Sequence, residues 1–242
     1  MTRVARTDGS PALTGRETGP LPVLAVTGLA KEARMAEGPG VIAVGTGGNP
    51  HRLRQFLAER REAGCRAVVS FGIAGGLDPA LAPGDIVIAA GIVSESGRSP
   101  ADSALVRSLL ARLQDSRLRV VSGDLAGVDA AVTTLAGKAE LRAVSGACAV
   151  DMESHVAADF AGRHGLPFAA IRVVCDPAEQ ALPAFAAQAL KPNGEPDLGK
   201  VLGALVRGSA SLGSLIRLAR DSSAAFGSLS RARARLGVGL GI

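Results

Sequence analysis

The chain has 242 residues, of which 47% are hydrophobic and only 2% aromatic, and its formal net charge is +5. This length suffices for one substantial core, and the core must consist mainly of aliphatic side chains because Trp and Tyr are absent. The three cysteines form no Cys-x-x-Cys pair, which argues against a disulfide framework and indicates buried free thiols in a reducing cytoplasm.

The chain shows no sign of a targeting or membrane-spanning segment. It has neither an N-terminal apolar region nor a run of eighteen apolar residues, so we expect a cytoplasmic protein. The positive charge is concentrated in residues 200–242, where seven cations face the single acid Asp221. Because no aromatic residues are interleaved with these cations, a nucleic-acid partner is not expected.

Short apolar runs alternate with helical patterns, which is typical of an α/β protein. The predicted strands cover residues 23–26, 41–44, 67–70, 85–90, 119–122, 144–149 and 168–174. The predicted helices cover residues 29–36, 51–63, 131–136 and 153–164, with one or two more from about 201 onward. We expect a disordered tail over 1–20, one α/β/α domain over 21–190, and a basic helical extension over 191–242, packed on or beside that domain.

The glycine-rich segments are ambiguous by themselves. Gly45-Thr-Gly-Gly lacks both the terminal glycine of a dinucleotide fingerprint and an acidic residue about twenty positions later. Gly137-Lys138 lacks the upstream glycine and the hydroxyl of a phosphate-binding loop. The predicted loop Gly72–Gly76 follows a buried strand, and it could be either a plain turn or a place where the backbone approaches a ligand.

Two carboxylates stand at the ends of predicted elements. Glu153 begins a helix and Asp176 ends a strand, so each could act in catalysis or serve only as a helix-terminal charge and a turn residue. Separated carboxylates beside a glycine-lined cleft suit a reaction with a cationic transition state. Histidines 51, 155 and 164 are too dispersed for a metal site, so none is predicted.

Four motifs in order resemble the nucleoside phosphorylase and nucleosidase superfamily, in particular the nucleosidases that cleave methylthioadenosine. The motifs are Phe71–Leu77 with Pro83–Val87, resembling Gly-Ser-Ala-Gly-Gly-Leu and Gly-Asp-Ile-Val; Val150–Glu153, resembling Val-Glu-Met-Glu; Arg172–Ala178, resembling Arg-x-x-Ser-Asp-x-Ala; and Gly28–Glu32, resembling Gly-Ala-Met-Glu-Glu. The resemblance covers most of residues 22–180 and implies a three-layer α/β/α sandwich with a mixed central sheet.

The resemblance also implies roles. Asp176 would protonate N7 of a purine leaving group, and Glu153 would bind the ribose hydroxyls and stabilise the oxocarbenium ion. Met152 would lie beneath the sugar, and the backbone of Ala74 and Gly75 would line the base and anomeric region. Glu32 would orient or deprotonate a water, although the alternative that Glu32 is a solvated helix charge stays open.

Departures from the phosphorolytic relatives favour hydrolysis slightly. Those relatives hold phosphate with two arginines and a hydroxyl. Here Glu32 stands at the first arginine position, the central loop has no arginine, and Ile73 replaces the hydroxyl. The nearby Arg34, Arg52 and Arg54 could compensate, so inorganic phosphate stays open as a co-substrate. No other cofactor is expected.

The C-terminal part resembles bacterial hopanoid-associated phosphorylases, to which removal of adenine from adenosylhopane is ascribed. Their motifs are similar to Val150–His155, Arg163–Pro167, Ala181–Pro183 and Leu215–Ser222. This implies a nucleoside substrate with a triterpenoid at its 5′ carbon, within hopanoid lipid biosynthesis, and a homo-oligomer of two or more chains. The basic extension could contact the inner membrane face or simply pack on the core. The competing hypothesis is a catalytically silent nucleoside-binding or membrane-associated accessory protein with the same fold.

Overall fold

The computed structural model describes residues 20–59, 64–114, 118–182 and 212–242. It shows an α/β protein with a mixed sheet flanked by helices, which confirms the predicted class. The strands are β1 (Val23–Thr27), β2 (Val41–Gly45), β3 (Ala67–Gly76), β4 (Ile86–Ser94), β5 (Gly97–Pro100), β6 (Val120–Gly127), β7 (Ala149–Asp151) and β8 (Phe168–Asp176). The helices are α1 (Ala30–Ala36), α2 (Pro50–Ala58), α3 (Ser103–Gln114), α4 (Leu135–Ser145), α5 (Ser154–Arg163) and α8 (Leu212–Leu236), with a final 3-10 turn at Val238–Gly241.

Five strands of the sheet close into a ring. Strand β3 pairs with β8, β8 with β4, β4 with β6, β6 with β7, and β7 returns to β3. Strands β1 and β2 extend the sheet from β3, and β5 forms an antiparallel edge beside β4. The ring brings the ends of β3, β7 and β8 together, because β3 pairs with both of the other strands near its carboxyl end.

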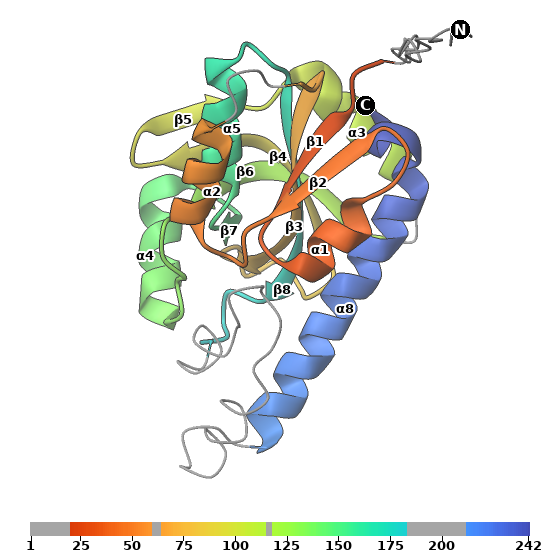
Figure 1. Ribbon diagram of the computed structural model, residues 1–242. Coiled ribbons are helices and arrows are strands. Elements are labelled where there is room, and N and C mark those ends of the chain that lie inside the picture. Colours follow the sequence, from red (N-terminus) through yellow and green to blue (C-terminus); the bar gives the residue numbers. More distant parts are fainter. Residues whose placement is uncertain (1–19, 60–63, 115–117, 183–211) are drawn as a thin grey trace, which may run out of the picture.

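Helices cover both sides of the sheet (Figure 1). On one side α1, α3 and α8 pack over a cluster that includes Phe71, Ile88 and Leu229, and on the other α2 and α5 pack over Leu24, Leu53 and Phe160. All nine residues of β8 are buried, which is expected for a strand covered on both faces. None of the helices in the described ranges is both long and apolar enough to span a membrane.

Helix α8 is integrated into the domain through one face. Its buried residues recur at helical spacing and include Asp221, Ala225, Ser228, Leu229, Ala232 and Leu236. The ammonium of Lys31 on α1 lies 3.8 Å from the ring centroid of Phe226 on α8. This cation–π contact ties α8 to the helix that carries Glu32.

Three local predictions were wrong. Residues 72–76 continue strand β3 and do not form a loop. The helix predicted at 131–136 begins at Leu135, because the Thr134 side chain caps it by accepting a hydrogen bond from Gly137 N at 3.0 Å. That helix runs to Ser145 and ends at Gly146 with φ +67°, so the strand predicted at 144–149 contributes only its last residue, to β7.

Other elements differ from the predictions in extent. Helix α3 was not predicted, although Leu105, Leu109 and Leu113 recur every four residues and the last two are buried. Helix α2 ends at Ala58, short of the predicted residue 63. The predicted tail 1–20 lies outside the described residues except at Pro20, as does the part of the extension before Leu212.

We predict that Leu229→Ala lowers the free energy of unfolding by about 2–5 kcal/mol, because Leu229 is fully buried between α8 and the sheet. The matched control is Ile216→Ala on the same helix, where the side chain is 62% exposed and the change should stay within about 0.5 kcal/mol. Denaturant unfolding measures both. Equal effects would contradict the integration of α8 into the core.

Candidate active site

Gly75 lies where three motifs meet. It pairs with Val150 of β7 on one side and with Asp176 of β8 on the other. A Cβ atom at Gly75 would lie 3.2 Å from Asp176 Oδ2, so the strand approaches this carboxylate closely. Strand β7 leads directly into Met152 and Glu153. The sheet register therefore brings the predicted base-binding, ribose-binding and proton-donating residues to one place.

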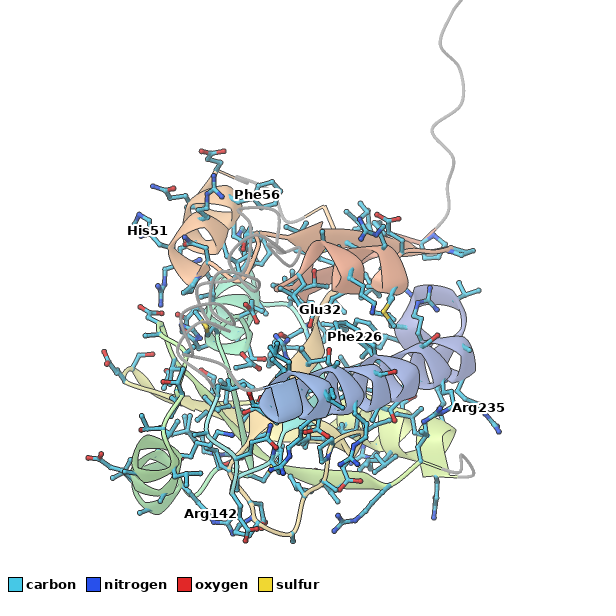
Figure 2. The ribbon with its side chains drawn as sticks, turned by 90° about the horizontal axis from the view of Figure 1, so that it is seen from below. Glu32, His51, Phe56, Arg142, Phe226 and Arg235 are labelled. Atoms are coloured by element: carbon cyan, nitrogen blue, oxygen red, sulfur yellow. The ribbon has the colours of Figure 1, made fainter. Side chains whose placement is uncertain are left out.

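The fourth motif joins them through Gly28. A Cβ atom at Gly28 would lie 2.8 Å from Glu153 Oε1, so the turn between β1 and α1 lies against the predicted ribose-binding carboxylate. Glu32, one turn into α1, points back at the same turn and is buried. Figure 2 shows Glu32 between α1 and α8, beside Phe226. Glu32 is thus an interior group, and the alternative of a solvated helix charge is wrong.

Backbone donors surround the carboxylate of Glu32. Its Oε2 accepts hydrogen bonds from Gly28 N at 2.9 Å and from Leu29 N at 2.6 Å, and its Oε1 accepts one from Ile73 N at 2.7 Å. A carboxylate has about four lone-pair positions, so one remains on Oε1. Such a cluster of backbone N–H groups is suited to binding an anion, and here the protein's own carboxylate fills it.

Arg172 lies at the centre of this region although it comes from the apolar strand β8. Only 1% of it is exposed, and a buried guanidinium requires partners. Its partners come from β3, β7 and the start of α5: Asp151 Oδ2 at 2.9 Å, Ser70 Oγ at 2.6 Å, Ser154 Oγ at 3.3 Å, the Ile73 carbonyl at 3.2 Å and Glu153 Oε2 at 3.3 Å.

The charges in this cluster do not balance when every group is ionised. Three buried carboxylates, Glu32, Asp151 and Glu153, surround the single cation Arg172. Burial raises the pKa of Glu32, while Arg172 and the backbone donors oppose the rise. Burial also raises the pKa of Glu153 to about 8; Arg172 opposes this, and Asp151 and Glu32 add to it. The environment of both carboxyls therefore favours the neutral form more than water does.

Glycine at position 72 makes room for the cluster. A Cβ atom there would lie 2.5 Å from Glu32 Oε1 and 2.6 Å from Arg172 Nη1, which is closer than real Cβ contacts. The φ angle of Gly72 lies outside the left-handed region, so space and not backbone conformation requires glycine. The glycines that the sequence singled out as a loop are strand residues that leave volume for charged side chains.

Asp176 has a partner that the sequence did not reveal. Lys138 of α4 is 1% exposed, and its ammonium lies 2.5 Å from Asp176 Oδ2. It also donates to the carbonyls of Pro177 at 2.8 Å and Gln180 at 3.1 Å, and so fastens the turn after β8. Burial raises the pKa of Asp176 above its ordinary value, and the charge of Lys138 opposes this. Lys138 therefore supplies the positive charge that stabilises the ionised form of this buried carboxyl.

The remaining predicted residues lie nearby. Ala74 is buried on β3, next to Gly75, and Met152 is half-buried between Asp151 and Glu153. Among the residues that the structure describes, no group of His, Cys, Asp and Glu is placed to bind a metal.

His155 and Ser154 point in different directions, so they do not form a triad. The Ser154 hydroxyl lies 2.9 Å from Ser70 Oγ, within the Arg172 cluster. His155 Nε2 lies 2.8 Å from Asp129 Oδ1, and Arg54 forms a two-bond ion pair with the same Asp129 at 2.7 and 3.0 Å. Arg54 is thus engaged by a carboxylate, although it was one of three cations considered for holding phosphate.

Sequence reasoning assigned no role to two residues of the candidate site, Arg172 and Lys138, for different reasons. Arg172 carried a signal, because a lone arginine within a buried apolar strand implies buried carboxylates nearby. The sequence gives almost no indication of the role of Lys138, because an isolated lysine on an amphipathic helix is normally solvated. Its pairing depends on the placement of α4 against the turn after β8, which is a tertiary contact.

Comparisons with known proteins show the family of the chain and the relatives that share its fold. The sequence profile of the phosphorylase superfamily matches residues 2–207, and the chain belongs to this superfamily. No curated protein sequence matches the chain.

Solved structures of nucleosidases share the fold at low sequence identity. The 5′-methylthioadenosine/S-adenosylhomocysteine nucleosidase of Helicobacter pylori, bound to butyl-thio-DADMe-Immucillin-A, has a TM-score of 0.62 and 16% identity over 78% of this chain and 99% of its own. The S-adenosylhomocysteine nucleosidase of Streptococcus pyogenes, in complex with 5-methylthiotubericidin, has a TM-score of 0.60 and 17% sequence identity. The match covers 67% of this chain and 86% of that chain. The futalosine hydrolase of H. pylori has a TM-score of 0.57 and 15% sequence identity. The match covers 79% of this chain and 97% of that chain.

We predict that Lys138→Met lowers the free energy of unfolding by about 3–5 kcal/mol near neutral pH, because it leaves Asp176 as an uncompensated buried charge. Since the folded pKa of Asp176 already exceeds its unfolded value, the neutral carboxyl is the better tolerated form. The deficit relative to wild type should therefore shrink as the pH falls toward 4 and grow as it rises.

The matched control is Arg142→Met, one turn further along α4, which removes a half-exposed ion pair with Asp78. Half-exposed pairs contribute less than about 1 kcal/mol. Chemical denaturation between pH 4 and pH 8 gives both values. If Lys138→Met were no more damaging than Arg142→Met at neutral pH, the compensating role of Lys138 would be refuted.

Proposed function

We propose that this protein hydrolyses the N-glycosidic bond of a 5′-substituted adenosine and releases adenine. The observation that carries the proposal is the convergence of Asp176, Glu153 and Glu32 around the Gly28 and Gly75 backbones. The nucleosidases with the same fold, whose names give adenosine derivatives as substrates, support the substrate class.

Asp176 is the proposed general acid. Burial raises its pKa, so a neutral carboxyl is accessible and can donate its proton to N7 as the C1′–N9 bond breaks. The purine then leaves as a neutral molecule and not as an anion. Lys138 holds the carboxyl in place and limits how far its pKa rises, while Ala74 and Gly75 line the base.

Glu153 and Met152 are proposed to hold the sugar. Ribose 2′ and 3′ hydroxyls that donate to Glu153 favour its ionised form, so substrate binding would lower the pKa of Glu153 and leave it negatively charged. The resulting negative charge lies where positive charge develops at the anomeric carbon, and it stabilises that charge in a site with little water.

Glu32 is proposed to activate the nucleophilic water. The remaining lone pair on its Oε1 can accept a hydrogen bond from a water, and a raised pKa makes the ionised carboxylate a stronger base. The water oxygen bonds to C1′ and its proton passes to Glu32. Phosphorolysis would need donors for an anion, whereas Gly28, Leu29 and Ile73 N–H groups already bind the Glu32 carboxylate. Hydrolysis is therefore favoured over phosphorolysis, and no cofactor is required.

Adenosylhopane is the proposed substrate, on the strength of the resemblance of segments 150–155, 163–167 and 215–222 to hopanoid-associated phosphorylases. The reaction would then be a step of hopanoid lipid biosynthesis, carried out by a cytoplasmic protein that meets its substrate at the inner membrane face. We further propose a homo-oligomer, because active sites in the superfamily lie near subunit contacts. A solution mass equal to the monomer's 24.3 kDa in the active form would contradict this.

The direct test is adenine release from adenosines that bear 5′-alkyl or 5′-alkylthio groups of increasing length, measured with and without phosphate. We expect release without phosphate and a preference for long apolar substituents. Absence of release from every analogue under both conditions would favour the alternative of a catalytically silent nucleoside-binding protein. Equal rates for all substituents would count against the hopanoid assignment but not against hydrolysis.

We predict that Asp176→Asn lowers kcat by about 10²–10⁴-fold, the usual contribution of a general acid. Glu153→Gln should raise KM and lower kcat together, because one carboxylate both binds the ribose and stabilises its positive charge. Steady-state kinetics with circular dichroism as a folding check provide the measurement. Near-wild-type constants in either folded variant would show that the site is misassigned.

A further inference from the structure

A second polar hollow lies between α8 and the loops that precede β4 and β6. Its volume is about 650 Å³, and it shares no residue with the site around Arg172. The lining comprises Pro83, Gly84, Asp85, Leu118, Arg119, Arg220, Ser223, Ala224, Gly227, Ser228 and Arg231. Three arginines, Arg119 from the loop before β6 and Arg220 and Arg231 from α8, therefore line one open hollow.

The contribution of α8 is one regular stripe. Arg220, Ser223, Ala224, Gly227 and Arg231 follow at steps of three, one, three and four residues, so they occupy one face of the helix. The neighbouring face, which carries Ala225, Leu229 and Ala232, is buried in the core and holds the helix in place. The hollow is thus lined by a fixed element, and a ligand would not have to order it.

The wall of the hollow is made of small residues. Gly84 has φ +98°, and a Cβ atom there would lie 3.2 Å from Ser228 Oγ, so glycine permits both the turn and its approach to α8. A Cβ atom at Gly227 would meet only Arg231 Nη1, at 3.7 Å. A helix without bulky side chains along this stripe leaves open space directly beneath charged groups.

Positive charge exceeds negative charge around the hollow. Asp85 is its only lining carboxylate among the described residues, and it is already bound by Arg119 Nη1 at 2.6 Å and by Ala82 N at 2.8 Å. Arg231 is directed by the buried Ser228, whose Oγ accepts from its Nη2 at 3.0 Å. Arg220 is largely exposed, and the buried Asp221 lies 3.7 Å from its Nε.

We infer that this hollow binds the phosphate group of a phosphate ester. Guanidinium groups bind phosphate oxygens with paired, charge-assisted hydrogen bonds, and the hydroxyls of Ser223 and Ser228 add neutral donors. A net excess of cations favours a phosphate over a neutral ligand. The phosphate could belong to a soluble ester or to the head group of an anionic phospholipid, and both sources present the same oxygens.

The test uses full-length protein and two double variants of equal charge. Arg220→Gln with Arg231→Gln removes two guanidinium groups from the hollow. The matched control, Arg217→Gln with Arg235→Gln, removes two exposed guanidinium groups from the same helix outside the hollow. A third variant, Gly227→Glu, places a carboxylate in the open space and leaves every arginine present.

Binding is measured to inorganic phosphate and glycerol phosphate by calorimetry, and to vesicles of phosphatidylglycerol or phosphatidylcholine by co-sedimentation at low and high salt. We expect saturable binding of at least one phosphate probe, weakened about tenfold or more by the hollow variant and by Gly227→Glu. The control variant should bind within about twofold of wild type. Adenine release should be unchanged in all three variants, which separates this site from the proposed active site.

Binding of the soluble phosphates identifies a soluble ester as the ligand, and binding of phosphatidylglycerol vesicles alone identifies a lipid head group; either supports the site. Equal loss in the control variant would show diffuse attraction along α8 and overturn the inference. So would binding that Gly227→Glu leaves intact, or no binding of any phosphate probe by the wild-type protein. Thermal unfolding confirms that each variant is folded.

Discussion

A single buried cation, Arg172, determines how the active-site elements fit together. Its guanidinium bonds with β3 through Ser70 and Ile73, and with β7 and the start of α5 through Asp151, Glu153 and Ser154. A buried charge is tolerated only when its partners are close and well oriented. The geometry that satisfies Arg172 is therefore also the geometry that presents Glu153 next to Gly28 and Glu32.

The same cluster explains why glycines recur in the motifs. Gly28 lies against Glu153, Gly72 against Glu32 and Arg172, and Gly75 against Asp176. At each position a Cβ atom would meet a charged side chain at 3.2 Å or less. Glycine stands at these three positions because charged side chains from other elements occupy the volume beside them. The close packing of backbone at these glycines therefore depends on the same charged side chains that form the candidate site.

Much of the fold could be predicted from the sequence. The apolar run 168–174 predicts a buried strand and lies within β8, and Gly165 followed by Pro167 marks the end of α5. Helix α4 was misplaced because its apolar residues do not mark its buried face: Leu135 and Val144 are exposed, whereas Lys138 is buried. The signals that bound it are a threonine cap and a left-handed glycine. Strand closure from β7 to β3 could not be foreseen, since pairing over long sequence distances leaves no local trace.

The candidate site could be predicted only at the residues that belong to a recognisable motif. Glu32, Glu153 and Asp176 were identified, but their partners follow from tertiary contacts. Lys138 reaches Asp176 across 38 residues, and Ile73 N reaches Glu32 across 41. These partners bear directly on the proposed mechanism, because Lys138 opposes the rise in the pKa of Asp176, the proposed acid, and the backbone donors oppose the rise in the pKa of Glu32, the proposed base.

The central claim is that Glu32 occupies the backbone donors that an attacking anion would need, so that water is the nucleophile. The most direct measurement is identification of the sugar product by phosphorus NMR and mass spectrometry, with excess inorganic phosphate present throughout the reaction. The account predicts an unphosphorylated sugar formed in equal amount to adenine. Accumulation of a sugar 1-phosphate in step with adenine would contradict it.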